Sequence, residues 1–236
     1  MLPFYLLFIF LFMSSFCDSI PVKLEQKKIL FCMVFFALAL FAGLRYNFPD
    51  YKSYSDFFYL LNNKSVISSE GNLAIVANDK GYIYINKFIG LFSDNSILLF
   101  LVMAFLSVGI NLSCYKKYTP YFFTAILFYY VHTYIGRELM QIRAGLACAL
   151  CLYSIRYIVS KKIYHFLFVI LLAATIHLAA ITFLISYFLC NLKIGVKTLR
   201  YLILISLVIG VCMPLGQWKV WIGFRIIQDG KDSIKL

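Results

Sequence analysis

Long runs of apolar residues without a formal charge constrain this chain more than any other feature of its sequence. A helix needs about 20 apolar residues to cross a hydrocarbon core roughly 30 Å thick, and runs approaching that length recur along the whole chain. Each unpaired backbone group costs roughly several kcal/mol in hydrocarbon, so such runs cross a bilayer as helices that satisfy their own hydrogen bonds. The runs also lack the alternation of polar and apolar positions that a transmembrane strand requires. The predicted fold class is therefore all-α, a polytopic integral membrane helix bundle.

The apolar runs predict about seven transmembrane helices in a single membrane domain, residues 1–236. The first run has no preceding Lys or Arg and no small-residue cleavage site, so it is interpreted as a retained helix and not as a signal peptide. Another crossing carries Arg143 and Arg156 near opposite ends of a segment about 31 Å long, where long side chains reach the interface. The predicted helices are residues 2–17, 29–44, 96–115, 119–136, 139–159, 163–190 and 200–217.

Basic residues outnumber acidic residues by 22 to 10, which gives a formal net charge of +12. In a soluble protein this excess would indicate nucleic-acid binding. Only 14% of the residues are charged, however, and most of the basic ones lie in short loops between apolar runs, where they set topology and contact anionic lipid. We therefore expect membrane lipids, and no nucleic acid, among the partners.

The distribution of the basic residues favours an N-terminus on the outer side. Short loops and the tail on one side of the predicted membrane carry twelve of the 22 Lys and Arg residues. The other side carries ten, but five of these are spread over one long loop, residues 45–95, and the positive-inside rule discounts long loops. The long loop is therefore predicted to lie outside, although Lys193, Lys197 and Arg200 argue against this orientation.

The predicted outer loop, residues 45–95, is longer than a simple connection requires, and loops of such length are often functional. Two segments within it place apolar residues at helical spacing, which predicts two short amphipathic helices on the membrane surface. An ordinary interfacial loop with aromatic anchors would show the same pattern. The predicted apolar faces are Tyr54, Phe57, Phe58 and Leu61 in the first helix, and Ile85, Phe88, Ile89 and Phe92 in the second.

A charged segment, residues 136–143, lies at the predicted outer end of the helix at 139–159. Arg137 and Gln141 are one helical turn apart and share a face. Arg143 lies about one turn inside the predicted helix, where an unpaired charge costs on the order of 3 kcal/mol, so we expect it to face a cavity or an anionic partner. Alternatively, Arg137 pairs with Glu138, and Arg143 extends its side chain to the interface.

His177 lies in the middle of the predicted helix at 163–190. Mid-membrane histidines face the interior of a bundle, either at a functional site or hydrogen-bonded to a neighbouring helix, and the sequence leaves both roles open. No cluster of His, Cys, Asp or Glu has the spacing of metal ligands, so we expect neither a metal nor another cofactor.

Several short motifs follow one another over about residues 29–190. They are Arg45 with Asp50, Tyr51 and Tyr54; Gly81-Tyr82; Ile142-Arg143 with Gly145-Leu146-Ala147; and His177 in an Ala-rich helix. In this order and spacing they resemble the EpsG family, the Wzy-like polymerases of exopolysaccharide, capsule and O-antigen synthesis. Two features depart from the family. Ala144 stands where members commonly have Gln, and the tail at 223–236 resembles an inner loop that leads onward, which predicts a truncated member.

The resemblance implies an enzyme that joins undecaprenyl-diphosphate-linked oligosaccharide repeat units into surface polysaccharide at the outer face of the bacterial inner (cytoplasmic) membrane. A chain-length regulator and a flippase are expected as further partners. A sugar hydroxyl would attack the anomeric carbon of the growing glycan, with His177 or Asp50 as general base, while fixed cations stabilise the departing lipid diphosphate. The residues expected to bind substrate are Arg143 and Arg45 at the diphosphate, Arg137 as a third cation, and Gln141, Tyr51 and Tyr54.

Three other functions fit a membrane protein of this kind. An O-antigen ligase-type transferase would share the outer arginines and the lipid-diphosphate chemistry. A polysaccharide transporter or flippase would show half-chain repeats or helices interrupted at the membrane midplane, and the sequence indicates neither. A non-catalytic membrane subunit would not need a charge as deep as Arg143.

Overall fold

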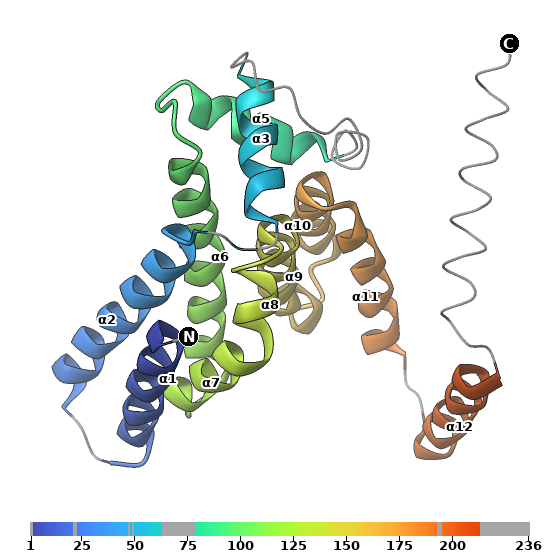
Figure 1. Cartoon of the computed structure of the whole chain (residues 1–236). Coiled ribbons are helices and arrows are strands. Elements are labelled where there is room, and N and C mark those ends of the chain that lie inside the picture. Colours follow the sequence, from blue (N-terminus) through green and yellow to red (C-terminus); the bar gives the residue numbers. More distant parts are fainter. Residues whose placement is uncertain are drawn as a thin grey trace, which may run out of the picture. The chain divides into compact units, whose positions relative to one another are not determined.

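The computed structural model describes residues 2–20, 23–46, 48, 50–62, 79–192 and 195–212. All regular secondary structure within these residues is helical, which confirms the predicted all-α class for the described part of the chain (Figure 1). The chain divides into two units, Met1–Cys190 and Asn191–Leu236, and the second contains α12 (Val196–Cys212). That the two units form a single membrane domain stays a prediction.

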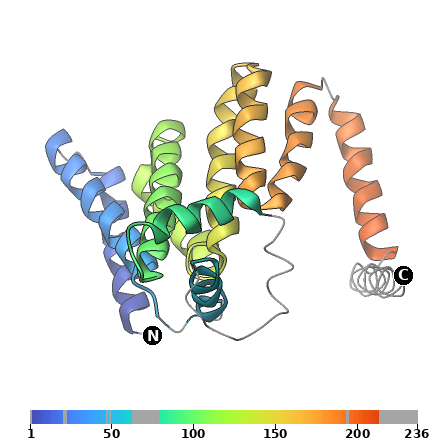
Figure 2. The same ribbon diagram turned by 90° about the horizontal axis from the view of Figure 1, so that it is seen from above.

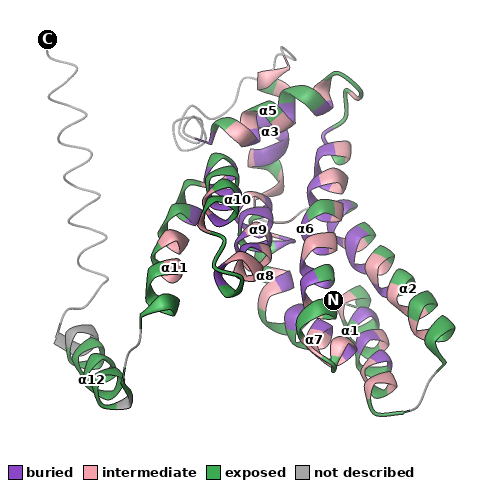
Figure 3. Cartoon of the chain, turned by 180° about the vertical axis from the view of Figure 1, so that it is seen from behind, coloured by how far each residue is buried: buried purple, intermediate pink, exposed green. Residues whose placement is uncertain are grey.

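Three helices of the first unit are long and apolar enough to cross a membrane: α2 (Leu24–Gly43), α6 (Ile97–Tyr118) and α9 (Ile142–Val159). Shorter apolar helices lie at α1 with η1 (Leu2–Asp18), at α10 (Ile163–Ile176) and at η3 with α11 (Leu178–Asn191). Large apolar side chains such as Phe36, Leu106 and Phe168 are exposed on the outward faces of these helices (Figure 3). The chain is thus a membrane protein whose outer surface suits lipid, while the seven crossings stay a prediction.

The α6 helix lies at the centre of the first unit, between α2 and α9, and α10 packs on α9. The seam between α2 and α6 repeats every four residues on both helices, which is the spacing of ridges that interdigitate between helices. At the end of this seam near Gly43 the helices approach so closely that a Cβ on Gly43 would lie 2.8 Å from the Cα of Leu101. The buried seam consists of Val34, Leu38 and Ala42 on α2 and Ala104, Val108 and Leu112 on α6.

Two short helices cross one end of this bundle, α3 (Tyr51–Leu61) and α5 (Lys80–Gly90) (Figure 2). They are the two helices predicted within the outer loop, although residues 63–78 between them lie outside the described residues. The predicted apolar face of α3 is correct, because Tyr54, Phe57 and Phe58 are buried.

Of the predicted face of α5, Ile89 is buried and Ile85 is partly buried against the core, but Phe88 is 61% exposed and Tyr82 and Asn86 are buried instead, so the buried face is rotated from the predicted one. The position of Gly81 explains the rotation, since a Cβ there would lie 2.3 Å from Oγ1 of Thr175 on α10. The face that includes Tyr82 therefore turns toward the bundle, and Phe88 turns away from it.

The helix predicted at 163–190 is not continuous. The α10 helix ends at Ile176, His177 adopts extended backbone angles (φ −151°, ψ 112°), and the chain continues as η3 (Leu178–Phe183) and α11 (Leu184–Asn191). The break is stabilised by Asp79, whose Oδ1 accepts the backbone N–H of Leu178 at 3.1 Å. The expectation that no helix is interrupted was therefore wrong at His177.

The segment predicted as two helices at 119–136 and 139–159 also differs in detail. The α7 helix (Phe122–Tyr129) continues through a π-helical turn, η2 (Tyr130–Tyr134), into α8 (Ile135–Arg137), and α9 begins only at Ile142. Gln141 leaves the helical region (φ −112°, ψ 69°), so a turn separates α8 from α9. Arg143 consequently lies in the first turn of α9 and not one turn inside the helix.

Candidate functional site

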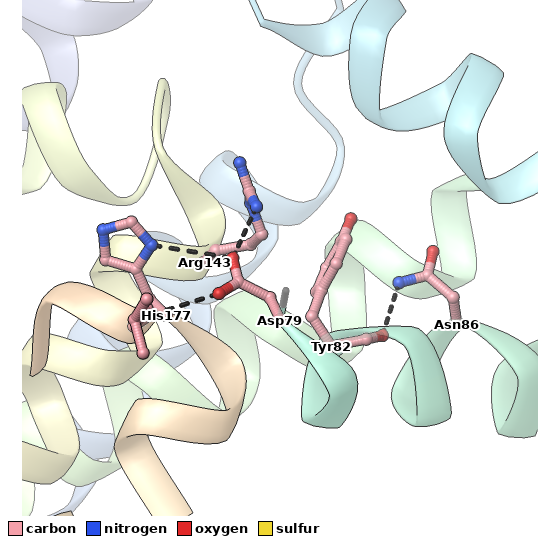
Figure 4. Close-up of polar contacts among 6 residues, drawn as sticks. Asp79, Tyr82, Asn86, Arg143 and His177 are labelled. Carbon is pink, nitrogen blue, oxygen red and sulfur yellow. Dashed lines mark hydrogen bonds and ion pairs between the residues drawn. The ribbon is translucent and has the colours of Figure 1, made fainter. Parts of the chain in front are cut away.

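Four segments far apart in sequence bring their ends together at one polar cluster. Asp79 precedes α5, Arg143 lies in the first turn of α9, and His177 follows the last residue of α10 (Figure 4). Tyr54 on α3 lies next to Arg143. We refer to Asp79, Arg143 and His177 as the triad cluster. Asp79 lies 64 positions before Arg143 and 98 positions before His177, so only the packing of α5 against α10 and of α10 against α9 joins them.

A short ion pair forms the centre of the triad cluster. Arg143 Nη1 donates to Asp79 Oδ2 at 2.6 Å, and the two side chains are 13% and 5% exposed. Asp79 occupies the position before the first residue of α5, yet its carboxylate makes no capping bond there and turns toward Arg143 and Leu178 instead. The anionic partner expected for Arg143 is therefore a residue of the chain itself.

His177 completes the triad cluster and is its most accessible member. Its Nδ1 lies 3.8 Å from Asp79 Oδ2, has no hydrogen-bond partner within the described structure, and belongs to a side chain that is 35% exposed. A carboxylate beside an imidazole can hold the ring in one orientation, as in acid–base sites. The geometry thus suits an imidazole that takes up a proton from a bound group.

Two buried phenols flank the guanidinium of Arg143. The ring centroids of Tyr54 and Tyr82 each lie 5.6 Å from its Cζ, within the range of cation–π attraction. Burial raises the pKa of Tyr54, although the nearby Arg143 opposes that shift, and burial also raises the pKa of Tyr82. Both side chains therefore remain neutral phenols at ordinary pH, able to donate a hydrogen bond.

Arg45, just after the end of α2, is buried without an ion-pair partner in the described part of the chain. Its Nη1 donates to the backbone carbonyl of Glu138, and its Cζ lies 4.6 Å from the ring centroid of Phe100. The Nε and Nη2 atoms are buried and have no acceptor. Burial lowers the pKa of Arg45 to about 10, so the side chain still carries its charge at neutral pH. A cation with two unused donors is suited to an anionic ligand.

The other predicted site residues lie around this centre. Tyr51 stacks on Phe100 at 4.9 Å between centroids, and Asp50 precedes α3, where its carbonyl accepts the N–H of Tyr54. Arg137 ends α8, Gln141 precedes α9, and both are exposed. The structure thus brings Arg143 next to Tyr54, links Arg143 to His177 through Asp79, and packs both Arg45 and Tyr51 on Phe100. Asp50, Arg137 and Gln141 lie outside the triad cluster.

A second buried carboxylate belongs to Glu138, the residue whose backbone carbonyl accepts the hydrogen bond from Arg45. Its Oε1 accepts hydrogen bonds from Ser107 Oγ and Tyr129 Oη, both at 2.8 Å, and from Asn111 Nδ2 at 3.4 Å. Glu138 therefore turns inward to neutral donors. The alternative in which Arg137 pairs with Glu138 is not what the structure shows. Its backbone carbonyl meanwhile holds Arg45, so this network positions the cation.

Sequence reasoning missed Asp79 and Glu138 as site residues, for different reasons. Asp79 was one of several acidic residues in a long loop. Its only distinguishing feature in the sequence was that aspartate, a residue preferred at the N-cap, stands just before the start of a predicted helix. For Glu138 the signal was Ser107 and Asn111, two polar residues one turn apart within an otherwise apolar run. Neither signal names a partner.

The triad cluster lies at one end of α6 and α9, and Lys116, Lys117 and Arg156 lie toward the other end. The α9 helix begins beside Arg143 and, after 18 residues or about 27 Å, ends beyond Arg156. The α6 helix begins next to α5 and ends at Lys116 and Lys117. Within the described residues there is no group of three or more His, Cys, Asp or Glu side chains suited to a metal, and the expectation of a reaction without metal stays a prediction.

Comparisons with known proteins agree with the resemblance noted in the sequence. The amylovoran biosynthesis protein AmsC of Erwinia amylovora is 26% identical over 186 residues, which cover 77% of this chain and 48% of AmsC. The chain thus spans about half the length of this curated relative, and no solved structure matches it. The sequence model of the EpsG family matches residues 28–228, a segment that contains Arg45 and the whole triad cluster. The chain belongs to the EpsG family.

Proposed function

We propose that the chain acts in surface-polysaccharide synthesis as a polymerase that joins undecaprenyl-diphosphate-linked repeat units at the outer face of the bacterial inner membrane. Membership of the EpsG family and the likeness to a protein of amylovoran biosynthesis support the pathway. The reaction type is supported mainly by the triad cluster, in which the partly exposed imidazole of His177 lies beside the carboxylate of Asp79 and its partner Arg143. The cluster lies at one end of an apolar bundle, and Arg45 supplies a second cation nearby.

The proposed location follows from charge. The helix ends remote from the triad cluster carry Lys116, Lys117 and Arg156, and basic residues in short loops remain on the cytoplasmic side. The triad cluster then faces the periplasm, where lipid-linked repeat units become available. The crosswise α3 and α5 helices, with Phe88 turned outward, lie at the headgroup level in this arrangement.

The proposed reaction transfers the growing glycan from its lipid carrier to a new repeat unit. A hydroxyl oxygen of the incoming lipid-linked unit forms a bond to the anomeric carbon of the glycan, and the bond from that carbon to the diphosphate oxygen breaks. The hydroxyl proton passes to His177, and the lipid diphosphate leaves with the electron pair. General base catalysis of this kind contributes roughly 10²- to 10⁴-fold to a rate.

His177 is preferred to Asp50 as the base because its ring lies beside Asp79, with Nδ1 buried, while the side chain as a whole is 35% exposed. Asp79 is assigned the role of stabilising the imidazolium and of holding Arg143. Since Asp79 already offsets the charge of Arg143, the main diphosphate ligand is proposed to be Arg45, with Arg143 in support. Arg137, Gln141, Tyr51 and Tyr54 are proposed to contact the sugars, and a chain-length regulator and a flippase remain proposed partners.

The broken α10 helix favours a second candidate, a transporter of lipid-linked glycans. Transporters place unwound backbone at their substrate site, as this chain does at His177. A strain that lacks a flippase and a strain that lacks a polymerase accumulate different products. Without a flippase, single repeat units stay on the cytoplasmic face of the membrane, whereas without a polymerase they accumulate on the periplasmic face. Loss of a ligase would instead leave finished polymer on the lipid carrier.

The test is a strain that lacks the gene and is complemented with wild-type protein, His177→Ala or His165→Ala. His165 is the matched control, because it lies on α10 but contacts Tyr157 far from the triad cluster. We expect a ladder of chain lengths with wild type and His165→Ala, and only single periplasmic repeat units with His177→Ala at equal protein level in the membrane. An unchanged ladder with His177→Ala would remove the proposed base.

A further inference from the structure

An apolar groove is lined in part by Arg45. It has a volume of about 460 Å³ and runs between α1 and α2. Arg45 is the one charged residue among those that line it. The lining includes Phe4 from α1, Ala37, Leu40, Phe41 and Leu44 from α2, and Arg45.

The groove combines two features that rarely occur together. Its walls offer hydrocarbon contacts and almost no hydrogen-bonding groups, so they do not suit a sugar or a nucleotide. Yet Arg45 is only 5% exposed and has two buried N–H groups without an acceptor, which is unfavourable unless an anion satisfies them. A hydrocarbon chain that carries a phosphate at one end would satisfy both features at once.

We propose that this groove binds the phosphate end of a polyprenyl carrier lipid, with the first isoprene units between α1 and α2 and the phosphate oxygens at Arg45. The inference rests on the proposed function, because it specifies how that substrate is held. Leu40 and Leu44 are 41% and 59% exposed on the lipid-facing side, so the rest of the lipid chain can continue into the bilayer.

The position of Arg45 connects this groove to the proposed chemistry. Arg45 and Arg143 have two electrostatic neighbours in common, the phenols of Tyr54 and Tyr82. A phosphate bound at Arg45 therefore presents its attached sugar toward Arg143 and His177. The Glu138 carbonyl fixes one edge of the Arg45 guanidinium, which leaves the other donors for the ligand.

Photolabelling of the purified full chain in lipid nanodiscs tests the groove. The probes are undecaprenyl monophosphate with a diazirine near the phosphate, the matching undecaprenol, and phosphatidylglycerol as competitor. We expect the phosphate probe to label α1 or α2 at least about ten-fold more than the alcohol, since charge-assisted bonds to phosphate are among the stronger polar contacts. Equal labelling by both probes, or full competition by phosphatidylglycerol, would overturn the proposal.

Three variants sharpen the result. Arg45→Gln should bring labelling by the phosphate probe down to that of the alcohol, and Leu40→Trp should reduce labelling by both probes because it fills the groove. Met33→Trp is the matched control, since Met33 is exposed on the same helix but does not line the groove. Labelling that persists in Leu40→Trp as in Met33→Trp would place the lipid elsewhere.

The outcomes separate this inference from the proposed function. If the groove takes the label but the His177→Ala strain still makes the full ladder, the lipid site stands and the proposed polymerase reaction falls. If the His177→Ala strain loses the ladder but the label appears outside α1 and α2, the reaction stands and the groove is wrong.

Discussion

The two ends of α9 carry the same side chain in different surroundings. At the start of the helix, Arg143 pairs with Asp79 at 2.6 Å, next to His177. At its last turn, the Cζ of Arg156 lies 3.5 Å and 4.6 Å from the ring centroids of Tyr153 and Tyr157, and Arg156 Nη2 donates to both phenol oxygens. Neither tyrosine is a charge partner at neutral pH.

The difference separates chemistry from anchoring. Tyrosines beside an arginine at a helix end form the usual interfacial belt, in which the charge reaches headgroups and water. An arginine paired with a buried carboxylate, beside an imidazole, is an arrangement that stabilises changing charge. We therefore expect substitutions at the Arg143 end to remove activity and those at the Arg156 end to have little effect.

The largest effect is expected for Arg143→Ala, which should abolish polymer. It also leaves Asp79 as a buried unpaired charge, a change that costs about 3–5 kcal/mol of stability. The double variant Asp79→Ala/Arg143→Ala should regain part of the lost thermal stability in detergent, since the Leu178 N–H still lacks its acceptor, while still making only single repeat units. Polymer from the double variant would mean that the ion pair is structural.

Asp79→Asn should slow polymerisation in isolated membranes by roughly 10²-fold, since a carboxylate that stabilises an imidazolium is important in acid–base catalysis. The asparagine retains the shape of the side chain but has a single acceptor oxygen, so it can accept from Leu178 or from Arg143 and not from both. We expect the turnover rate to fall more than the apparent affinity for the lipid-linked unit. A change confined to affinity would contradict the assigned role.

Gly81→Ala should reduce polymerisation by about ten-fold, because overpacking costs about 1–3 kcal/mol and a small misplacement of reactive groups slows catalysis. The added methyl group would lie 2.3 Å from Thr175 Oγ1, so α5 and Asp79 must move away from α10. Thr175→Ala should restore part of the rate in the double variant. Gly136→Ala is the control, since a Cβ there meets nothing within 4 Å.

Arg156→Gln should have the smallest effect, with polymer length and amount within about two-fold of wild type. Cation–π contacts at exposed sites contribute only about 0.5–1 kcal/mol. Polymer ladders from strains with matched protein levels measure this directly. A loss as large as that of Arg143→Ala would show that the two ends of α9 do not differ as proposed.

The sequence predicted helices where the structure has them because the apolar runs leave lipid-exposed backbone no alternative. It also predicted α3 with its buried face, since a four-residue repeat reports directly on one side of a helix. It failed at two breaks between helices. The break at His177 depends on the hydrogen bond from the Leu178 N–H to Asp79, and the start of α9 depends on the turn at Gln141. Neither feature can be recognised from the neighbouring residues in the sequence.

What the sequence alone determined is the helical class, the position of most helices and the enrichment of arginine toward certain helix ends, because these depend on hydropathy and on neighbours within one or two turns. The tertiary structure decided that Asp79 pairs with Arg143, that Glu138 turns inward and that Arg45 is left with unused donors. Those relations depend on how α3, α5, α6, α9 and α10 pack, and side-chain packing between distant segments is not encoded in the periodicity of any one of them.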